Sequence, residues 1–204
     1  FNQRIIKEKT EVKSVDFDQE LNVVVVRTVD ETRYEINSKK KIRTSGCALG
    51  TVFGNLMDEI DEIKLSPREI KVSILYDLAR KINTTPSLYL ETGAIHGTVL
   101  CDYSGPLVYM EDVGRHNAVD KISGWMLNND VVGEDKILYT TGRLTSEMVI
   151  KAAIMGIPIL LSRSGFTAWG VEIAKSVGLT MVGRLRGERF LCLTGSKNLI
   201  FNEK

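Results

Sequence analysis

Short apolar runs separated by helical patterns dominate the last third of this chain and constrain its fold more than any other feature. The runs are Ile137–Tyr139, Ile157–Leu161 and Thr180–Val182. Strands that alternate with helices along a sequence form parallel sheets, with the helices packed against the faces of the sheet. The sequence therefore predicts that these runs are neighbouring parallel strands of an α/β domain.

Arginine follows each of the predicted strands. The positions are Arg143, Arg163, Arg184, Arg186 and Arg189. Parallel sheets bind ligands outside the carboxyl ends of their strands, so these side chains should meet at one edge. Fixed cations at one edge repel each other unless an anion lies between them, and the guanidinium fork matches phosphate oxygens. We therefore expect a phosphorylated ligand at this edge.

Hydroxyl groups at the same strand ends would add hydrogen-bond donors to such a site. They belong to Thr140, Thr141, Ser162 and Ser164. The helices after the first two strands would contribute free backbone N–H groups. The alternative is that the arginines form solvated surface ion pairs, which contribute little free energy. The sequence lacks a Gly-Lys-Ser/Thr run of the Walker type, so a P-loop is not expected.

The charge distribution also favours a compact anion. The net charge of the chain is +1, so no overall field attracts nucleic acid. The segment from Lys136 to Arg189 is locally basic, with eight Lys or Arg against three Glu. Basic groups at loop tips suit one compact anion better than a duplex, which needs a basic face. We expect no nucleic-acid partner.

The composition is that of an ordinary globular protein, with 43% apolar and 26% charged residues. No apolar stretch approaches the roughly 18 residues of a membrane span, and no signal-peptide pattern opens the chain. The three cysteines show no regular spacing, which argues against a disulfide framework and for a reducing compartment. We therefore expect a cytoplasmic protein without a membrane partner.

The first third of the chain has the pattern of a small β region. Asn22–Thr28 and Arg33–Ile36 are predicted strands around a turn. A basic run, Lys39–Arg43, leads into Thr44–Gly54, which is rich in Gly, Ser and Thr and is predicted to be a mobile loop. Ser66–Glu69 has the pattern of a capping box with Pro at the first helical position, so a helix should start there.

Residues 66–204 are predicted to form a three-layer α/β domain, preceded by the small β and loop region, 1–65. Two strands joined by a tight turn come before the repeated strand–helix units. In order, the predicted elements are a helix to about Lys81, a short helix near Pro86–Glu91, strands Ile95–Tyr103 and Leu107–Met110, helices Gly114–Leu127, Ser146–Met155 and Thr167–Val177, and a last strand, Arg189–Leu193.

Cys47 is the sharpest candidate for covalent chemistry. It follows the basic run Lys39–Arg43 in the predicted loop. Nearby cations lower the pKa of a thiol, and the thiolate is the nucleophile. The alternative, a bystander thiol, has about equal weight on this pattern alone. Cys101 and Cys192 alternate with apolar residues in predicted strands and should be small buried hydrophobes.

His116 is the histidine whose setting suggests function. It lies in the first turn of a predicted helix, four residues before Asp120. The helix dipole lowers the proton affinity of such a histidine, whereas the Asp120 carboxylate raises it and can orient the ring. Such a histidine suits proton shuttling or contact with a cofactor; the alternative is a capping and packing role. His96 begins a strand and is expected to make ordinary hydrogen bonds.

A catalytic metal is not expected. A zinc site of the nucleobase-deaminase kind needs H-x-E at one helix start and P-C-x-x-C at the next. This chain has His116-Asn117-Ala118 at the first position and Thr141–Ser146, TGRLTS, at the second. The general acid/base glutamate and both cysteine ligands are therefore missing, although the order of elements resembles that architecture.

Several of these runs resemble the formate dehydrogenase accessory sulfurtransferases, the FdhD-type family. The resemblance covers most of the chain from about Arg43 onward. It rests on Thr44–Gly50 (TSGCALG), Glu111–Gly124 (EDVGRHNAVDKISG), Tyr139–Ala153 (YTTGRLTSEMVIKAA) and Gly156–Phe190, with a looser match at Thr92–Leu100. Family members carry a further N-terminal segment, so we expect that Phe1 is not the natural start.

The resemblance implies a cytidine-deaminase-like fold without zinc and a role in maturing formate dehydrogenase. In that family a cysteine desulfurase hands sulfur to a loop cysteine as a persulfide, and the sulfur passes to molybdenum in a bis(molybdopterin guanine dinucleotide) cofactor. The persulfide position falls on Cys47. The resemblance also implies a homodimer. The cofactor-binding run falls on Arg184, Leu185, Arg186, Gly187, Glu188 and Arg189, and Arg143, Arg163, Arg115 and His116 are the further candidate contacts.

The chain departs from the family pattern at the loop cysteines. The family loop has the form C-G-x-C-G, whereas this chain has one cysteine, with Gly50 or Thr44 in place of the other, depending on alignment. A persulfide relay needs one nucleophilic sulfur, but resolution through an internal disulfide needs two. Alternatives to a sulfurtransferase are therefore a non-catalytic chaperone for the molybdenum cofactor and, less favoured, a deaminase-class enzyme.

Overall fold

A six-stranded mixed sheet forms the centre of the protein in this computed structural model, which describes residues 6, 9–30, 41–43, 51–53 and 60–201. Its strand order is β11-β10-β9-β8-β6-β7, and β8, β9 and β10 are parallel. The outer pairings, β6 with β7 and β8 and β10 with β11, are antiparallel. The strands are β6 (His96–Cys101), β7 (Pro106–Asp112), β8 (Ile137–Thr140), β9 (Ile159–Ser162), β10 (Thr180–Arg186) and β11 (Arg189–Thr194).

The three parallel strands predicted from the apolar runs are thus confirmed. Every residue of β8 and β9 is buried, because helices cover both faces of the sheet. A strand covered on both sides needs an uninterrupted apolar run rather than an alternating one. The register pairs Tyr139 with Leu161 and Leu161 with Val182, so the strand ends carrying Arg143, Arg163 and Arg184 are adjacent.

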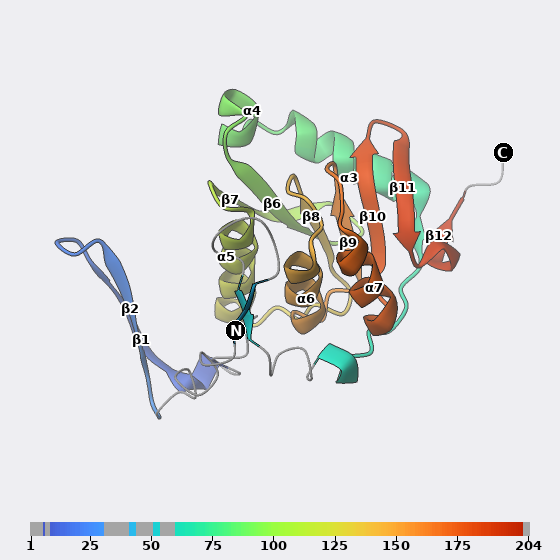
Figure 1. The fold of residues 1–204 in the computed structure, drawn as a ribbon. Coiled ribbons are helices and arrows are strands. Elements are labelled where there is room, and N and C mark those ends of the chain that lie inside the picture. Colours follow the sequence, from blue (N-terminus) through green and yellow to red (C-terminus); the bar gives the residue numbers. More distant parts are fainter. Residues whose placement is uncertain (1–5, 7–8, 31–40, 44–50, 54–59, 202–204) are drawn as a thin grey trace.

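Helices cover the two faces of the sheet unequally (Figure 1). On one face, α3 (Val72–Thr84) packs against a core that includes Tyr139, Leu161 and Leu185. The other face is covered by α5 (Arg115–Asn128), α6 (Ser146–Ile154) and α7 (Ala168–Val177), around Leu138, Leu160 and Met181. The predicted three-layer α/β domain is therefore confirmed, and α7 ends at Gly178 in the left-handed conformation, φ 78°.

The helix start predicted at Ser66–Glu69 is wrong. That segment is not helical, and α3 begins at Val72, after a two-residue strand, β5 (Ile70–Lys71). β5 pairs in parallel with β12 (Leu199–Ile200), and Ile70 is buried. The local capping signal is overridden because burial of Ile70 and pairing with the chain's distant end hold this stretch extended.

The N-terminal part of the chain forms two small antiparallel ribbons. β2 (Val23–Thr28) falls at the predicted first strand, but it pairs with an upstream strand that was not predicted, β1 (Val12–Asp18). The predicted partner, Arg33–Ile36, lies outside the described residues. β4 (Thr51–Phe53) pairs with β3 (Lys41–Arg43), so the end of the predicted loop is a strand. Segment 44–50, which contains Cys47, lies outside the described residues.

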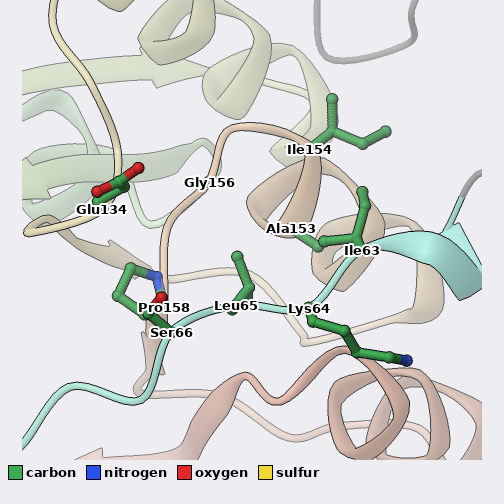
Figure 2. Close-up of a pocket in the computed structure, with 9 residues that line it drawn as sticks. All are labelled: Ile63, Lys64, Leu65, Ser66, Glu134, Ala153, Ile154, Gly156 and Pro158. Atoms are coloured by element: carbon green, nitrogen blue, oxygen red, sulfur yellow. The ribbon is translucent and has the colours of Figure 1, made fainter.

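The amino ends of β8 and β9 form the opposite end of the molecule from the predicted site. A pocket of about 270 Å³ lies there between 63–66 and residues such as Glu134 and Pro158 (Figure 2). Lys64, at its rim, donates to the backbone oxygen of Ser176 at 2.9 Å. The boundary predicted at residue 65 stays a prediction, although Ile60 packs into the core formed by α5, α6 and α7.

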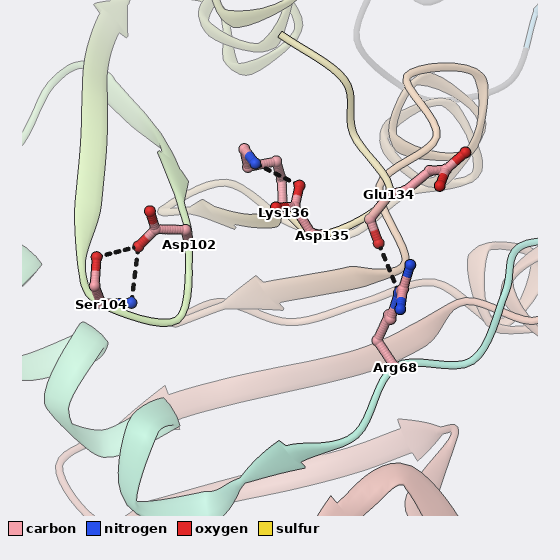
Figure 3. A network of polar contacts seen from close by, with 6 residues as sticks. All are labelled: Arg68, Asp102, Ser104, Glu134, Asp135 and Lys136. Carbon is pink, nitrogen blue, oxygen red and sulfur yellow. Dashed lines mark hydrogen bonds and ion pairs between the residues drawn. The ribbon is translucent and has the colours of Figure 1, made fainter.

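Polar contacts close the turns at this same end (Figure 3). The Asp102 carboxylate accepts the backbone N–H of Ser104 at 2.7 Å and its hydroxyl at 2.5 Å. The pKa of Asp102 is lowered, chiefly by the Ser104 hydroxyl; burial opposes this, and the backbone N–H groups of the turn lower the pKa further. Arg68 Nε donates to the backbone oxygen of Glu134 at 3.0 Å. These contacts are local to the turns, which leaves the other end of the sheet as the candidate site.

Candidate ligand-binding edge of the sheet

The loops after β8 and β9 are tied together by hydroxyl groups. Ser162 Oγ donates to the backbone oxygen of Gly142 at 2.7 Å and accepts the N–H of Ser164 at 2.9 Å. Thr140 Oγ1 accepts the N–H of Gly142 at 3.1 Å. Both Thr140 and Ser162 are fully buried. These two hydroxyls therefore shape the loops, whereas the sequence had suggested them as donors to a ligand.

Arg163, Arg184 and Arg186 line one pocket at the ends of β9 and β10. This arginine pocket has a volume of about 290 Å³ and is completed by Ser164 and Gly165. Arg184 adopts the left-handed conformation, φ 53°, which is sparsely populated for residues other than glycine. Its N–H donates to the backbone oxygen of Ser164 at 2.9 Å, which ties the end of β10 to the loop after β9. The pocket therefore lies where the ends of β9 and β10 come together, as the sequence predicted.

Arg163 is held in place by groups from α3 and from α4 (Leu88–Thr92). Its Nη1 donates to Asn83 Oδ1 at 3.0 Å, and its guanidinium carbon lies 5.4 Å from the centre of the Tyr89 ring. Arg186 Nε in turn donates to the backbone oxygen of Arg163 at 3.2 Å. A guanidinium held by a hydrogen bond and a cation–π contact loses less entropy when it binds an anion.

Glu111 explains how Tyr89 comes to lie beside Arg163. The Glu111 carboxylate accepts the N–H groups of Leu88 and Tyr89, at 3.2 and 2.8 Å, and so caps the start of α4. Asp112, the next residue, serves the start of the following helix, α5: its Oδ1 accepts the N–H of Gly114 at 2.9 Å. Both carboxylates belong to the end of β7.

The residues of the predicted cofactor-binding run, 184–189, lie in different surroundings in the fold. Leu185 is fully buried against α3, so only its backbone can face a ligand. Gly187 and Glu188 lie at the β10–β11 turn and line a second pocket, of about 330 Å³, together with Tyr76 and other residues of α3. Arg189 begins β11 and is exposed. The run therefore contributes to two pockets on either side of the turn.

A second group of basic side chains surrounds the loop after β8. His96 Nδ1 lies 3.4 Å from Thr141 Oγ1. A Cβ atom added at Gly142 would lie 2.8 Å from Arg115 Cβ, so Arg115 packs directly on this loop. Burial lowers the pKa of His96, and the charges of Arg115, His116 and Arg143 lower it further. Arg143 thus belongs to this group and is not among the residues that line the arginine pocket.

His116 contacts Glu147, a residue that the sequence did not single out. His116 Nε2 lies 2.8 Å from Glu147 Oε2, whereas the predicted partner, Asp120, is hydrogen-bonded to Lys151. Each member of the His116–Glu147 pair is the second residue of its helix, α5 or α6. The one sequence signal was an acidic residue in the first turn after TTGR, but such residues are common at helix starts.

The two described cysteines are poor nucleophiles. Cys101 is fully buried, and burial raises its pKa to about 12, with a further contribution from Asp102. Burial also raises the pKa of Cys192, against a smaller lowering by its hydrogen bond with the backbone of Thr194. A neutral thiol neither attacks nor carries sulfur efficiently. Of the chain's cysteines, this leaves Cys47 as the candidate carrier.

The described residues offer no ready metal site. Among them, no group of three or more His, Cys, Asp or Glu side chains is placed to hold a metal ion. In the same part of the chain, no helix combines the length and apolar character needed to cross a membrane.

Comparison with known proteins identifies the family. The sequence model of the FdhD/NarQ family matches residues 1–200. The chain belongs to the FdhD/NarQ family. This confirms the resemblance drawn from the four sequence runs, and it extends the match to the N-terminal ribbons.

Relatives of this FdhD/NarQ chain include proteins named sulfur carrier protein FdhD. The one from Wolinella succinogenes is 32% identical over 197 residues, which are 96% of this chain and 68% of that protein. The one from Bacillus subtilis is 31% identical over 196 residues, 93% of this chain and 73% of that protein. A crystal structure described as a formate dehydrogenase accessory protein, from Desulfotalea psychrophila, matches with a TM-score of 0.76 and 29% identity, over 98% of this chain and 76% of that one.

Proposed function

We propose that this protein is a sulfurtransferase that carries sulfur as a persulfide on Cys47 for the maturation of formate dehydrogenase. A cysteine desulfurase supplies the sulfur, and the acceptor is the molybdenum of a bis(molybdopterin guanine dinucleotide) cofactor bound as substrate. The proposal is supported by membership of the FdhD/NarQ family and by relatives named as sulfur carriers. A cytidine-deaminase-like fold without zinc, a cytoplasmic location and a homodimeric assembly are parts of the same proposal.

The arginine pocket is the single observation that supports cofactor binding in this proposal. Three arginines, Arg163, Arg184 and Arg186, line one small cavity. Arg163 is already oriented by Asn83 and Tyr89. Oriented arginines at strand ends suit the pyrophosphate of a guanine dinucleotide. The neighbouring pocket, with Tyr76 and Glu188, offers an aromatic ring and a carboxylate to the rest of the ligand.

The sulfur half of the proposal rests on Cys47 by elimination and on the family match. Cys101 and Cys192 have raised pKa values, so neither supplies a thiolate near neutral pH. Cys47 follows four basic residues in the sequence, Lys39, Lys40, Lys41 and Arg43, and nearby cations stabilise a thiolate.

Mass spectrometry tests the sulfur half directly. The protein is incubated with a cysteine desulfurase and cysteine, and peptides are searched for one added sulfur atom. We expect that sulfur on Cys47, and its loss from the Cys47→Ala variant, while Cys192→Ala still loads. Full formate dehydrogenase activity in cells that carry only Cys47→Ala would show that the covalent role is wrong.

A non-catalytic cofactor chaperone is the second candidate function. It is favoured by the single loop cysteine where the family pattern has two. The two functions differ in what remains after Cys47→Ala: a chaperone keeps supporting the dehydrogenase, whereas a sulfur carrier does not. Nucleotide binding without any persulfide in the loading experiment would favour the chaperone.

A further inference from the structure

Glu111 lies at the carboxyl end of β7, which reaches the same edge of the sheet as the arginine pocket. β7 is antiparallel to β6, and β6 is antiparallel to β8, so β7 and β8 end at one edge. β6 and β8 separate β7 from β9, the strand that leads to Arg163. Both oxygens of the Glu111 carboxylate accept backbone N–H groups: Oε2 that of Leu88 at 3.2 Å, and Oε1 that of Tyr89 at 2.8 Å. Glu111 therefore connects the edge strand β7 with the start of α4.

The helix α4 depends on these two hydrogen bonds more than a longer helix would. It has five residues, Leu88–Thr92, and helices shorter than about 12 residues are marginal in water on their own. The first N–H groups of a helix have no partner within the helix. Glu111 takes two of them, and Ser87 Oγ takes that of Leu90 at 3.3 Å. Glu111 should therefore hold α4 in its helical form.

α4 in turn places the Tyr89 ring against the guanidinium of Arg163. The guanidinium carbon lies 5.4 Å from the ring centre, within the range of a cation–π contact. Such a contact uses the flat face of the guanidinium, whose N–H donors point outward in its plane. One donor, on Nη1, is taken by Asn83 Oδ1 at 3.0 Å. The contact with Tyr89 therefore fixes the plane of the guanidinium without using the N–H donors that an anion needs.

Arg163 is the arginine of the pocket for which such positioning matters most. It is half-buried, whereas Arg184 and Arg186 are exposed. Ordering a long side chain on binding costs conformational free energy, and a guanidinium that is already ordered avoids that cost. Arg186 also donates through Nε to the backbone oxygen of Arg163 at 3.2 Å. The orientation of Arg163 should therefore set a large part of the affinity for an anion.

We propose that Glu111 is a positioning residue of the arginine pocket, which acts through α4 and Tyr89 on the orientation of Arg163. The ligand class is a diphosphate, and the formation of α4 is linked to its binding. This inference rests on the proposed function, because it needs an anionic ligand at the arginine pocket. It goes beyond that function in giving roles to Glu111 and Tyr89, which lie outside the described lining of the pocket.

Binding measurements on variants of Glu111 test the positioning role. Removal of a negative charge would by itself strengthen the binding of an anion, whereas loss of positioning weakens it. For Glu111→Ala we expect roughly three- to tenfold weaker binding of guanosine diphosphate and of inorganic pyrophosphate, measured by isothermal titration calorimetry. Glu111→Gln keeps one oxygen acceptor and should recover part of the affinity. Glu91→Ala, the same change at an exposed position of α4, should bind like the wild type or slightly more tightly.

Variants of Tyr89 test whether the effect passes through Arg163. Tyr89→Phe keeps the aromatic ring and should bind both probes like the wild type. Tyr89→Leu removes the cation–π contact and should weaken binding by about three- to tenfold. In the Arg163→Ala background the same Tyr89→Leu change should have no further effect, because residues that act as a unit are not additive. Equal costs of Tyr89→Leu in the two backgrounds would overturn the route through Arg163.

Hydrogen exchange, followed by NMR, tests the linkage between α4 and the anion, which a merely structural cap would not show. If α4 orients Arg163, a bound anion must stabilise α4 in return, because coupling between two sites is reciprocal. Saturating pyrophosphate should therefore slow amide exchange at Tyr89 and at Gly93, whose N–H donates to the backbone oxygen of Tyr89 at 3.0 Å. The slowing at Gly93 should be lost in Tyr89→Leu. Exchange in α4 that pyrophosphate leaves unchanged in the wild type would overturn the linkage.

The outcomes separate this inference from the proposed function. A wild-type protein that binds neither probe overturns both the cofactor-binding part of the proposed function and this inference. Binding that is weakened by Arg163→Ala, but is unchanged or tighter in Glu111→Ala, overturns the inference alone. Circular dichroism identifies a variant that binds weakly because it is unfolded. If Glu111→Ala does not fold, the comparison of Tyr89→Leu with Tyr89→Phe decides the question in its place.

Discussion

At the scale of single residues, Arg163 has the contacts that most define the arginine pocket. It is held by Asn83 through a hydrogen bond and by the Tyr89 ring through a cation–π contact. Its backbone oxygen also accepts a hydrogen bond from Arg186. Loss of its side chain should therefore remove an already oriented positive charge from the pocket.

Arg163→Ala is expected to weaken binding of a guanine nucleoside diphosphate at least tenfold. Charge-assisted hydrogen bonds contribute about 1.5–3 kcal/mol each, and 1.4 kcal/mol is a factor of ten. Isothermal titration calorimetry measures the change. Arg68→Ala removes an arginine from the opposite end of the sheet (Figure 3) and should bind like the wild type. Equal affinity in Arg163→Ala and the wild type would place the nucleotide elsewhere.

Cys101 should make the protein sensitive to alkali. Burial raises its pKa to about 12 in the fold, from an ordinary value of 9.0. Below pH 9 the thiol is protonated in both states and contributes no pH dependence. Between these two values the unfolded chain loses the proton while the folded chain keeps it, so stability falls as pH rises, by up to about 4 kcal/mol.

The Cys101→Ala variant should therefore lose less stability than the wild type across that alkaline range, although its stability at neutral pH is lower. Urea denaturation at a series of pH values measures the difference. Cys192→Ala, at a half-buried thiol, should give a smaller effect in the same direction. Parallel curves for Cys101→Ala and the wild type would contradict the prediction.

At the scale of elements, the contact between the loop after α5 and the end of α6 depends on the absence of a side chain. A Cβ atom at Gly133 would lie 2.1 Å from the backbone oxygen of Met155 and 2.9 Å from the carbonyl carbon of Gly156. Backbone atoms cannot move aside as a flexible side chain does. This close approach sets how β8 enters the sheet beside α6.

Gly133→Ala should destabilise the protein by about 1–3 kcal/mol or more. Gly124→Ala is the matched control, because Gly124 lies within α5 and has no neighbour within 4 Å of an added Cβ. Alanine is favoured over glycine in a helix by roughly 0.5–1 kcal/mol, so this variant should be as stable as the wild type or more stable. Thermal unfolding of the two variants side by side measures both. Equal melting temperatures would contradict the geometry at Gly133.

At the scale of the whole molecule, a His–carboxylate contact joins two helix starts where a zinc-dependent deaminase would need its metal ligands. His116 and Glu147 sit at the two helix starts that the sequence comparison with the zinc motif singled out. They form a pair, and no group of three possible ligands is present among the described residues.

The purified protein should therefore contain no stoichiometric zinc. Elemental analysis of protein prepared without chelators measures this, with a zinc-dependent deaminase as the positive control. One zinc ion per chain would contradict the prediction and would return the deaminase class of function to consideration.

Elements with a local sequence signal could be predicted, whereas elements that depend on pairing with a distant segment could not. β8 and β9 were predicted because burial on both faces forces an apolar run, which is visible locally. The helix start at Ser66–Glu69 was mispredicted because Ile70 pairs with Leu199, from the far end of the chain. β1 was missed because its alternating polar pattern is weak and its pairing gives it little burial.

The candidate site was also predictable only in part: the sequence predicted where the arginines lie, but not which side chains they contact. The arginines at the ends of β8, β9 and β10 followed from strand order, because parallel strands bring their carboxyl ends to one edge. The partners of those side chains did not follow. Asn83 reaches Arg163 across 80 residues of sequence, and Glu147 meets His116 across the boundary between two helices.

The sequence by itself determined the three-layer class, the parallel strands and the gathering of cations at one edge. These features follow from the spacing of apolar residues and from the order of strands and helices along the chain. Only the tertiary structure decided that Arg163, Arg184 and Arg186 share a pocket while Arg143 joins His96, Arg115 and His116. It also decided that Glu147 Oε2 lies 2.8 Å from His116 Nε2. Such pairings depend on how helices and loops pack in three dimensions, which residue spacing along the chain does not specify.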